Sequence, residues 1–194
     1  MKNLFFATQN KNKLKEVRSI APAGFEIRDL DALNYSQDLK EDYNTLEENA
    51  AQKARTIHDQ FRISVFADDT GLEVEALNGA PGVRSARYAG DDKSDAANVE
   101  LLLKKLKGLA DRSARFRTVI VLILDGKEYQ FEGVVEGKII DEKRGENGFG
   151  YDPIFIPKGH TKTFAQMSLS DKNLISHRKR ALQKMMDFLE SKDI

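Results

Sequence analysis

Residues 116–135 read FRTVIVLILDGKEYQFEGVV, and this stretch decides the fold class. Residues 116–124 are rich in β-branched and large aliphatic side chains, which favour a strand. Asp125-Gly126 is the dipeptide of a tight hairpin turn, so residues 128–135 are predicted to return as an antiparallel strand. The sheet of this protein therefore contains at least one antiparallel pair.

Upstream of the hairpin, apolar segments alternate between strand and helix character. Residues 4–7 and 25–28 are predicted strands, separated by a helix that carries Leu14, Val17 and Ile20 on one face. Thr45 and Glu48 fit a capping box that opens a helix reaching about residue 60. A buried strand at 63–67 and a helix within 91–106 follow. Strand–helix alternation with a later hairpin indicates an α/β domain with a mixed sheet.

Downstream of the hairpin, residues 145–150 form a glycine-rich loop. From about Asn173 a basic helix is predicted to run to the C-terminus. Its apolar stripe consists of Leu182, Met185, Met186 and Leu189. No internal repeat or low-complexity linker interrupts the chain, so we expect residues 1–194 to form a single domain.

Composition restricts the class of protein. The chain has 194 residues, 40% of them hydrophobic and 32% charged, as expected of a globular protein and not of a disordered or fibrous one. Lys plus Arg and Asp plus Glu are 31 each, and this zero net charge argues against nonspecific nucleic-acid binding. There is no cysteine, and the three histidines are scattered, which excludes thiol catalysis and disfavours a histidine metal site.

Targeting signals are not evident in the sequence. The longest strongly apolar run, residues 119–124, is far too short to cross a membrane. The N-terminal residues lack the core and cleavage region of a signal peptide. We therefore expect a cytoplasmic protein that binds neither membranes nor nucleic acid.

A polar segment, Thr8-Gln9-Asn10-Lys11-Asn12-Lys13, lies between the first strand and the first helix. Backbone N–H groups at a helix start, with two lysines, suit a phosphate group. The spaced glycines and the Gly-Lys-Ser/Thr ending of a P-loop are absent. A polar turn with solvated lysines is the alternative.

Acidic residues gather in two places. Asp68-Asp69 stand at the end of the predicted strand 63–67, and their side chains should point to opposite faces. They therefore cannot chelate one ion together, but one could hold a metal ion or water while the other holds the loop. Alternatively, the pair simply forms the turn before Gly71. The second group could supply carboxylates to Mg²⁺ or form a solvated face; it contains Glu41, Asp42, Glu47 and Glu48.

Two C-terminal motifs could recognise a planar base. Gly148-Phe149-Gly150-Tyr151-Asp152-Pro153 presents aromatic rings beside glycines that permit close approach, or is a tight turn whose rings fill the core. Lys172 and Ser176-His177-Arg178 bring hydrogen-bond donors to the start of a helix, where positive charge opposes the helix dipole. A solvated amphipathic helix is the alternative for these residues.

Taken together and in order, these motifs resemble the inosine triphosphate pyrophosphatase family, the RdgB-like non-canonical purine nucleoside triphosphate pyrophosphatases. The resemblance spans nearly the whole chain, and its middle block, Leu77-Asn78-Gly79-Ala80-Pro81-Gly82-Val83, continues to Ser85-Ala86-Arg87-Tyr88. It implies an α/β fold with a long twisted mixed sheet flanked by helices, and two lobes around a central substrate cleft. It also implies a homodimer that uses Mg²⁺ to hydrolyse ITP, dITP and XTP to the monophosphate and pyrophosphate, which clears deaminated purines.

The resemblance assigns roles position by position. Asp69 corresponds to the proton acceptor, Glu41 and Asp69 to metal ligands, and Asp68 to a supporting metal or water contact. The positions corresponding to triphosphate contacts are Thr8, Gln9, Asn10, Lys11, Asn12, Lys13, Lys53 and Thr70. The positions corresponding to base contacts are Phe149, Gly150, Tyr151, Asp152, Lys172, His177 and Arg178.

The sequence departs from the family pattern at Gln9 and Asn12, where glycine is frequent, and at Thr70, where serine is common. Two other classes compete with the enzyme. A nucleotide sensor would need the phosphate loop and the base wall, but not Glu41 and Asp69 together. An RNA-binding module would use Phe149, Tyr151 and the basic helix, and the zero net charge argues against it.

Overall fold

The computed structural model describes residues 2–192. Its strands form one mixed sheet in the order β2-β1-β3-β5-β6-β7, with β4 paired to β3. The strands are β1 (Lys2–Phe6), β2 (Phe25–Arg28), β3 (Val65–Val74), β4 (Pro81–Gly82), β5 (Ser113–Leu124), β6 (Lys127–Ile139) and β7 (Phe155–Pro157). β1 runs parallel to β2 and β3, whereas β4 and β7 are antiparallel to their partners. The predicted α/β class with a mixed sheet is confirmed.

Five α-helices and five short 3₁₀ helices accompany the sheet among the described residues. The α-helices are α1 (Lys11–Ile20), α2 (Leu46–Phe61), α3 (Asp95–Leu106), α4 (Leu169–Ile175) and α5 (His177–Ser191). The 3₁₀ helices are η1 (Leu30–Leu33), η2 (Glu75–Leu77), η3 (Ser85–Arg87), η4 (Asp152–Ile154) and η5 (Phe164–Gln166).

The chain divides into two compact units, each built from separate segments. Unit 1 contains the residues up to Asp69, Thr118–Gly133 and the residues from Arg178 onward. Unit 2 contains Thr70–Arg117 and Val134–His177. Strands β3, β5 and β6 each contribute residues to both units.

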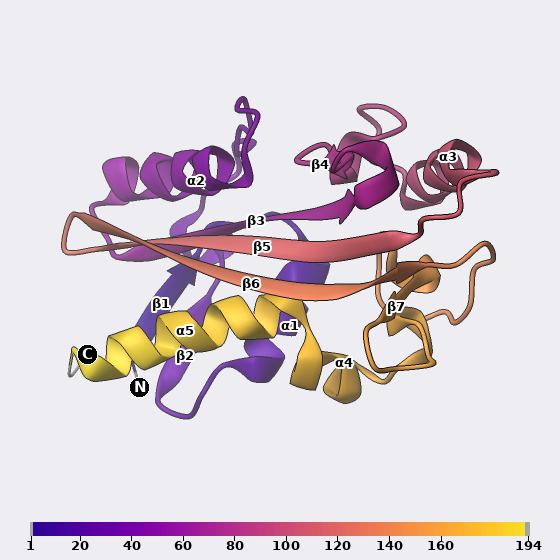
Figure 1. The fold of residues 1–194 in the computed structure, drawn as a ribbon. Coiled ribbons are helices and arrows are strands. Elements are labelled where there is room, and N and C mark those ends of the chain that lie inside the picture. The colour runs from indigo at the N-terminus through magenta and orange to yellow at the C-terminus, as the bar shows by residue number, and fades with distance from the viewer. Residues whose placement is uncertain (1, 193–194) are drawn as a thin grey trace. The chain divides into compact units, whose positions relative to one another are not determined.

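In unit 1 the strands are covered by helices on both faces. Helices α1 and α5 lie on one face, and α2 lies on the other (Figure 1). The predicted stripe of α5 is confirmed, because Leu182, Met185, Met186 and Leu189 are all buried in a core with Phe6 and Phe66, whose rings stack with centroids 4.5 Å apart. On the opposite face, α2 buries Ala50, Ala54 and Ile57 completely.

Unit 2 has its own apolar core. It joins Leu72 and Val74 of β3 to the buried side of α3 and to a group of aromatic rings. The predicted stripe of α3 is borne out, with Val99, Leu102 and Leu106 buried and Leu103 packed against them. The rings are those of Phe116, Tyr151, Phe155 and Phe164.

The hairpin expected from Asp125-Gly126 is present between β5 and β6. Both turn residues have positive φ, 50° and 75°, as a type I′ turn requires. The strands extend beyond the predicted 116–124 and 128–135 at their outer ends.

Two element boundaries differ from prediction. Strand β3 continues through Asp68 and Asp69 to Val74, because Leu72 and Glu73 pair with β4. A Cβ on Gly71 would lie 2.5 Å from the carbonyl oxygen of Gly82, so only glycine allows this close strand approach. The basic C-terminal helix is interrupted at Ser176, whose extended backbone separates α4 from α5.

Candidate active site

Asp68 and Asp69 are adjacent in β3, and their side chains leave opposite faces of the sheet. They are only 1% and 7% exposed. Asp68 contacts Lys13 of α1 and Arg178 of α5, whereas Asp69 contacts Asn49 and Lys53 of α2. The period of two along a strand thus directs one carboxylate to the helices on each face of unit 1.

On the α1/α5 face, Asp68 belongs to a set of buried ion pairs. Lys13 Nζ lies 3.0 Å from Asp68 Oδ1, and Arg178 Nε lies 3.2 Å from Asp68 Oδ2. Arg178 also donates to the Glu16 carboxylate of α1. Burial alone would raise the pKa of Asp68, but Lys13, Arg178 and Lys53 outweigh it and hold that pKa well below its usual range. Asp68 is therefore an anion balanced by two cations.

On the α2 face, one lysine joins both acidic residues that were predicted to bind metal. Lys53 Nζ lies 2.6 Å from Glu41 Oε1, 4.0 Å from Asp69 Oδ1 and 2.7 Å from the carbonyl oxygen of Asp68. Burial would lower the pKa of Lys53, but Asp69, Glu41 and Asp68 together raise it. Lys53 is thus a permanent cation between two carboxylates.

Asp69 differs from Asp68 in its basicity. Burial raises the pKa of Asp69, and the positive charges of Lys53 and Lys13 offset only part of that increase. Glu41 and Asp68 add to it. A carboxylate with a raised pKa is better suited to accept a proton from water than an ordinary aspartate.

The predicted phosphate segment is an ordered helix start. Asn10 is the N-cap of α1, and its side chain accepts hydrogen bonds from the backbone N–H groups of Asn12 and Lys13. The hydroxyl of Thr8 accepts from the backbone N–H of Asn10. The backbone N–H groups of Asn10, Asn12 and Lys13 are therefore already paired within the segment. The positive charge of the segment is carried by two lysine side chains, of which Lys11 is exposed and Lys13 is paired to Asp68.

Gln9, one of the departures from the family pattern, has a visible structural role. Its Nε2 donates to the carbonyl oxygen of Gln37 at 2.9 Å, and its Oε1 accepts from the backbone N–H of Leu39 at 3.1 Å. A glycine at this position could make neither side-chain bond. The glutamine thus ties the phosphate segment to the chain that leads to Glu41.

The carboxylates of unit 1 fit one type of metal site. Among residues 2–192, no group of three or more His, Asp or Glu side chains is arranged to hold a metal ion. Mg²⁺, however, commonly binds one or two carboxylates and completes its coordination with water and substrate phosphates. Glu41 and Asp69, which both contact the ammonium group of Lys53, are the carboxylates that could hold such an ion.

In unit 2, the predicted base residues are built around a second buried ion pair. Lys172 Nζ lies 2.6 Å from Asp152 Oδ2, and both side chains are 3% exposed. The same carboxylate accepts from the backbone N–H of Phe149 at 3.0 Å. Lys172 also lies 5.1 Å from the centroid of the half-buried Phe149 ring. The glycine at position 148 is required, because a Cβ there would lie 2.0 Å from the Asp152 carboxylate.

Other predicted base residues have structural contacts of their own. Tyr151 is buried in the core of unit 2, and its hydroxyl donates to the carbonyl oxygen of Ser85 at 2.9 Å. Burial raises the pKa of Tyr151. The backbone N–H of Gly150 donates to Asp95. His177 is 3% exposed and stacks on Phe116, with ring centroids 4.7 Å apart.

The structure thus separates the predicted residues by unit. Unit 1 holds Glu41, Asp68, Asp69, Lys53, residues 8–13 and also Arg178, and unit 2 holds Thr70, Phe149, Gly150, Tyr151, Asp152, Lys172 and His177. Arg178, predicted to contact the base, contacts Asp68 and Glu16 here, and its role at the base stays a prediction.

Sequence reasoning assigned no role to Glu16 or Asn49, both of which contact this group. Glu16 follows Lys13 by three residues on α1, and this i,i+3 spacing is the signal that could have placed it on the same face. Asn49 directly follows Glu48, which was assigned to the capping box of α2.

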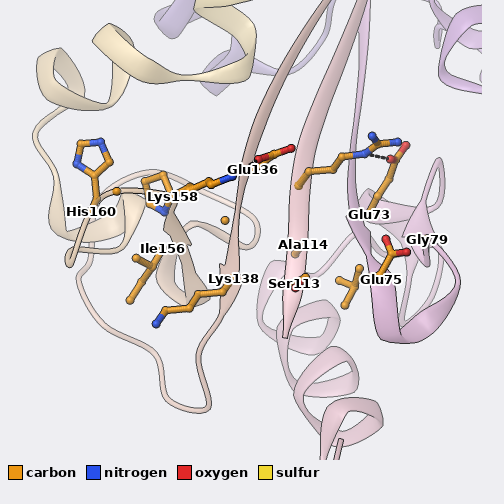
Figure 2. A pocket seen from close by; sticks show the side chains of 15 residues that line it. Glu73, Glu75, Gly79, Ser113, Ala114, Glu136, Lys138, Ile156, Lys158 and His160 are labelled. Carbon is orange, nitrogen blue, oxygen red and sulfur yellow. Dashed lines mark hydrogen bonds and ion pairs between the residues drawn. The ribbon is translucent and has the colours of Figure 1, made fainter. Parts of the chain in front are cut away.

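A separate depression of about 720 Å³ lies on unit 2 (Figure 2). Its wall carries Glu73, Arg115, Glu136 and Lys158, which form the ion pairs Arg115–Glu73 and Lys158–Glu136. None of the predicted site residues lines it.

No described helix combines the length and apolar character needed to cross a membrane.

Comparison with known proteins adds independent information. The sequence model of the Ham1 family matches residues 4–188. The dITP/XTP pyrophosphatase of Christiangramia forsetii is 50% identical over 186 residues, covering 96% of this chain and 98% of that protein. The protein of the same name from Bacillus subtilis is 45% identical, with 98% of each chain covered. The solved structure of the Staphylococcus aureus Ham1 protein superposes with a TM-score of 0.89 at 44% identity, covering 98% of this chain and all of that one.

Proposed function

Because this chain belongs to the Ham1 family, we propose that it is a nucleoside triphosphate pyrophosphatase acting on non-canonical purine nucleotides. Its substrates would be dITP, XTP and ITP, and its products the nucleoside monophosphate and pyrophosphate. The high identity to dITP/XTP pyrophosphatases over almost the full length of both chains supports the substrate class. The enzyme would remove deaminated purines from the nucleotide pool.

One observation carries the chemistry: Asp69 is a buried, basic carboxylate beside Lys53 and Glu41. In the proposed reaction, Asp69 accepts a proton from a water molecule while the oxygen of that water attacks the α-phosphorus. The bond to the bridging oxygen of the β-phosphate breaks, and pyrophosphate leaves with the electron pair of that bond. Lys53, which contacts both Glu41 and Asp69, would offset the negative charge of these carboxylates while the proton is transferred.

A triphosphate carries about four negative charges near neutral pH, so it needs cations around it. Lys11 and Lys13 at the start of α1 would supply part of that charge, and Glu41 and Asp69 would hold Mg²⁺. When bound, Mg²⁺ would neutralise phosphate oxygens and polarise the phosphorus that is attacked. The enzyme would be homodimeric, as the family resemblance implies, and cytoplasmic, as expected from its sequence.

Base choice would depend on the donors of unit 2. Hypoxanthine and xanthine have a carbonyl group at C6 where adenine has an amino group. Lys172 in its charged form only donates hydrogen bonds, so it favours the carbonyl, and Phe149 offers a ring for stacking. When adenine binds to a site built around a donor, that donor is left without an acceptor. This loss can favour the carbonyl-bearing bases over adenine by ~10⁴-fold.

Pyrophosphate release from dITP, XTP, ITP, dATP and dGTP, with Mg²⁺ and with excess chelator, tests this function. We expect release from the first three substrates, and only with the metal. A nucleotide sensor would bind the same nucleotides without releasing pyrophosphate, and that result would refute the enzyme.

A further inference from the structure

We infer that Asn49 is a positioning residue, whose buried side-chain amide fixes Asp69 relative to the loop that carries Glu41. This inference rests on the function proposed above and extends it to a residue that does not itself touch the substrate. Asn49 lies on α2 and is 1% exposed. It is thus held by packing before any ligand arrives.

All the contacts of the Asn49 amide agree with one orientation. Its Oδ1 accepts from the backbone N–H of Tyr43 at 2.9 Å. Its Nδ2 donates to the carbonyl oxygen of Tyr43 at 3.2 Å and to Asp69 Oδ2 at 3.3 Å. A flipped amide would face a donor with a donor and two acceptors with an acceptor. The side chain therefore joins a backbone segment to a carboxylate with no choice of geometry.

The loop before α2 is bound to one face of that helix, residue by residue. Glu41 contacts Lys53, Asp42 exchanges two hydrogen bonds with Gln52, and Tyr43 exchanges two with Asn49. Positions 49, 52 and 53 have the i, i+3, i+4 spacing that places side chains together on a helix. Of these three, Lys53 and Asn49 also reach Asp69, and Asn49 does so by a hydrogen bond from its amide.

This geometry matters because Glu41 and Asp69 come from different elements. Glu41 lies in the loop and Asp69 in β3, so their separation is not fixed by a shared backbone segment. Asn49 hydrogen-bonds to the loop two residues from Glu41 and also to Asp69 directly. Residues that orient metal ligands typically change metal affinity or activity 10–100-fold when mutated.

The chain offers a matched control. Asn98 on α3 is 2% exposed, accepts from the backbone N–H of Ala89 at 2.7 Å and donates to the carbonyl oxygen of Ala86 at 3.0 Å. Asn98 thus makes the same kind of backbone link in unit 2 without the bond to a carboxylate. Asn49→Ala and Asn98→Ala should both lower the melting temperature, but only the first should alter the metal requirement.

The experiment measures two quantities in the full-length protein. The first is the Mg²⁺ concentration that gives half-maximal pyrophosphate release from dITP, which we expect to rise about 10–100-fold in Asn49→Ala and to stay unchanged in Asn98→Ala. The second is amide hydrogen exchange without metal or nucleotide. Exchange should accelerate at Tyr43 in Asn49→Ala and at Ala89 in Asn98→Ala.

A third variant separates loop attachment from the bond to Asp69. Gln52→Ala removes the bonds to Asp42 and leaves Asn49 in place. If Gln52→Ala or Asn98→Ala raises the Mg²⁺ requirement as much as Asn49→Ala, the positioning role is overturned. It is also overturned if Asn49→Ala leaves either the Mg²⁺ requirement or Tyr43 exchange unchanged. Failure of the proposed function would appear separately, as no pyrophosphate release by the unmodified protein from any purine triphosphate.

Discussion

The two faces of β3 in unit 1 carry neighbouring aspartates in opposite electrostatic situations. On the α1/α5 face, Asp68 is paired with Lys13 and Arg178, and its pKa is lowered. On the α2 face, Asp69 is nearly as buried, but it shares Lys53 with Glu41, and its pKa is raised. The chain thus places a carboxylate paired with two cations directly beside one that shares a single lysine with a second carboxylate.

This difference teaches that burial alone does not determine what a carboxylate can do. A buried anion with two cations is a structural connection, because removing a partner leaves an uncompensated charge. A buried anion with too little positive charge is more basic and can take up a proton or a cation. Substitutions on the two faces should therefore have different consequences for stability and for activity.

The largest effect is expected on the Asp68 face. Arg178→Ala should lower the free energy of unfolding by about 3–5 kcal/mol, because Glu16 and Asp68 would remain buried without their shared cation. Arg115→Ala is the control, since the Arg115 side chain is half-exposed in its pair with Glu73 and its loss should cost about 0–1 kcal/mol. Chemical denaturation of both variants measures the difference, and equal losses would refute the structural role of Arg178.

Arg178→Ala also tests the predicted contact with the base. If Arg178 donates to the C6 carbonyl, pyrophosphate release from ITP should fall much more than release from ATP. A uniform loss for both substrates would mean that Arg178 acts through Asp68 and not at the base.

On the other face, Asp69→Asn should reduce pyrophosphate release at least about 100-fold, because an amide cannot accept the proton of water. Its stability should be maintained, since Lys53 keeps its contacts with Glu41 and the backbone of Asp68. Activity near the normal level in a folded Asp69→Asn protein would remove the proton-acceptor assignment.

A smaller effect is expected for the second proposed ligand. Glu41→Gln should raise the Mg²⁺ requirement about tenfold, because a neutral amide is a poorer ligand than a carboxylate for a hard cation. Titration of the dITP reaction with Mg²⁺ measures the change. Full activity of the unmodified protein in excess chelator would contradict the two-carboxylate arrangement.

The smallest effect is a difference in pH dependence. Because the folded-state pKa of Asp68 is below its unfolded value, its stabilisation is present above the unfolded pKa and is lost as pH falls. The folded-state pKa of Asp69 is above its unfolded value. The contribution of Asp69 to stability therefore decreases as pH rises from its unfolded pKa to its folded pKa. The melting temperature of Asp69→Asn relative to the unmodified protein should therefore increase from acid toward neutral pH. Each kcal/mol of difference in unfolding free energy corresponds to a change of about 2–4 °C. Calorimetry across this range would contradict the assignment if the difference were constant.

Much of the fold could be predicted because its signals are local. Asp125-Gly126 specifies its hairpin, and the stripes of α3 and α5 have helical spacing. The full length of β3 could not be predicted, because its continuation past Asp69 depends on pairing with β4 and on space beside Gly71. The interruption at Ser176 was missed because basic residues on both sides continue a helical pattern.

The site was predicted only in part for a similar reason. The alternation of side chains along a strand correctly placed Asp68 and Asp69 on opposite faces. The sequence could not reveal that Arg178 meets Glu16, because 162 residues separate them and both look like solvated helix positions. The link between Asn49 and Asp69 likewise depends on how α2 packs on β3, which no local pattern encodes.

The discontinuous composition of unit 1 has a consequence for biosynthesis. Its core needs Leu182, Met185, Met186 and Leu189 of α5 to cover strands that are synthesised more than a hundred residues earlier. Until α5 leaves the ribosome, Leu4, Phe6 and Phe66 have no cover from that helix, and Arg178 cannot yet neutralise Asp68. Contacts so distant in sequence slow folding and prolong exposure of apolar surface. The nascent chain therefore keeps this apolar surface without its helical cover until α5 has been made.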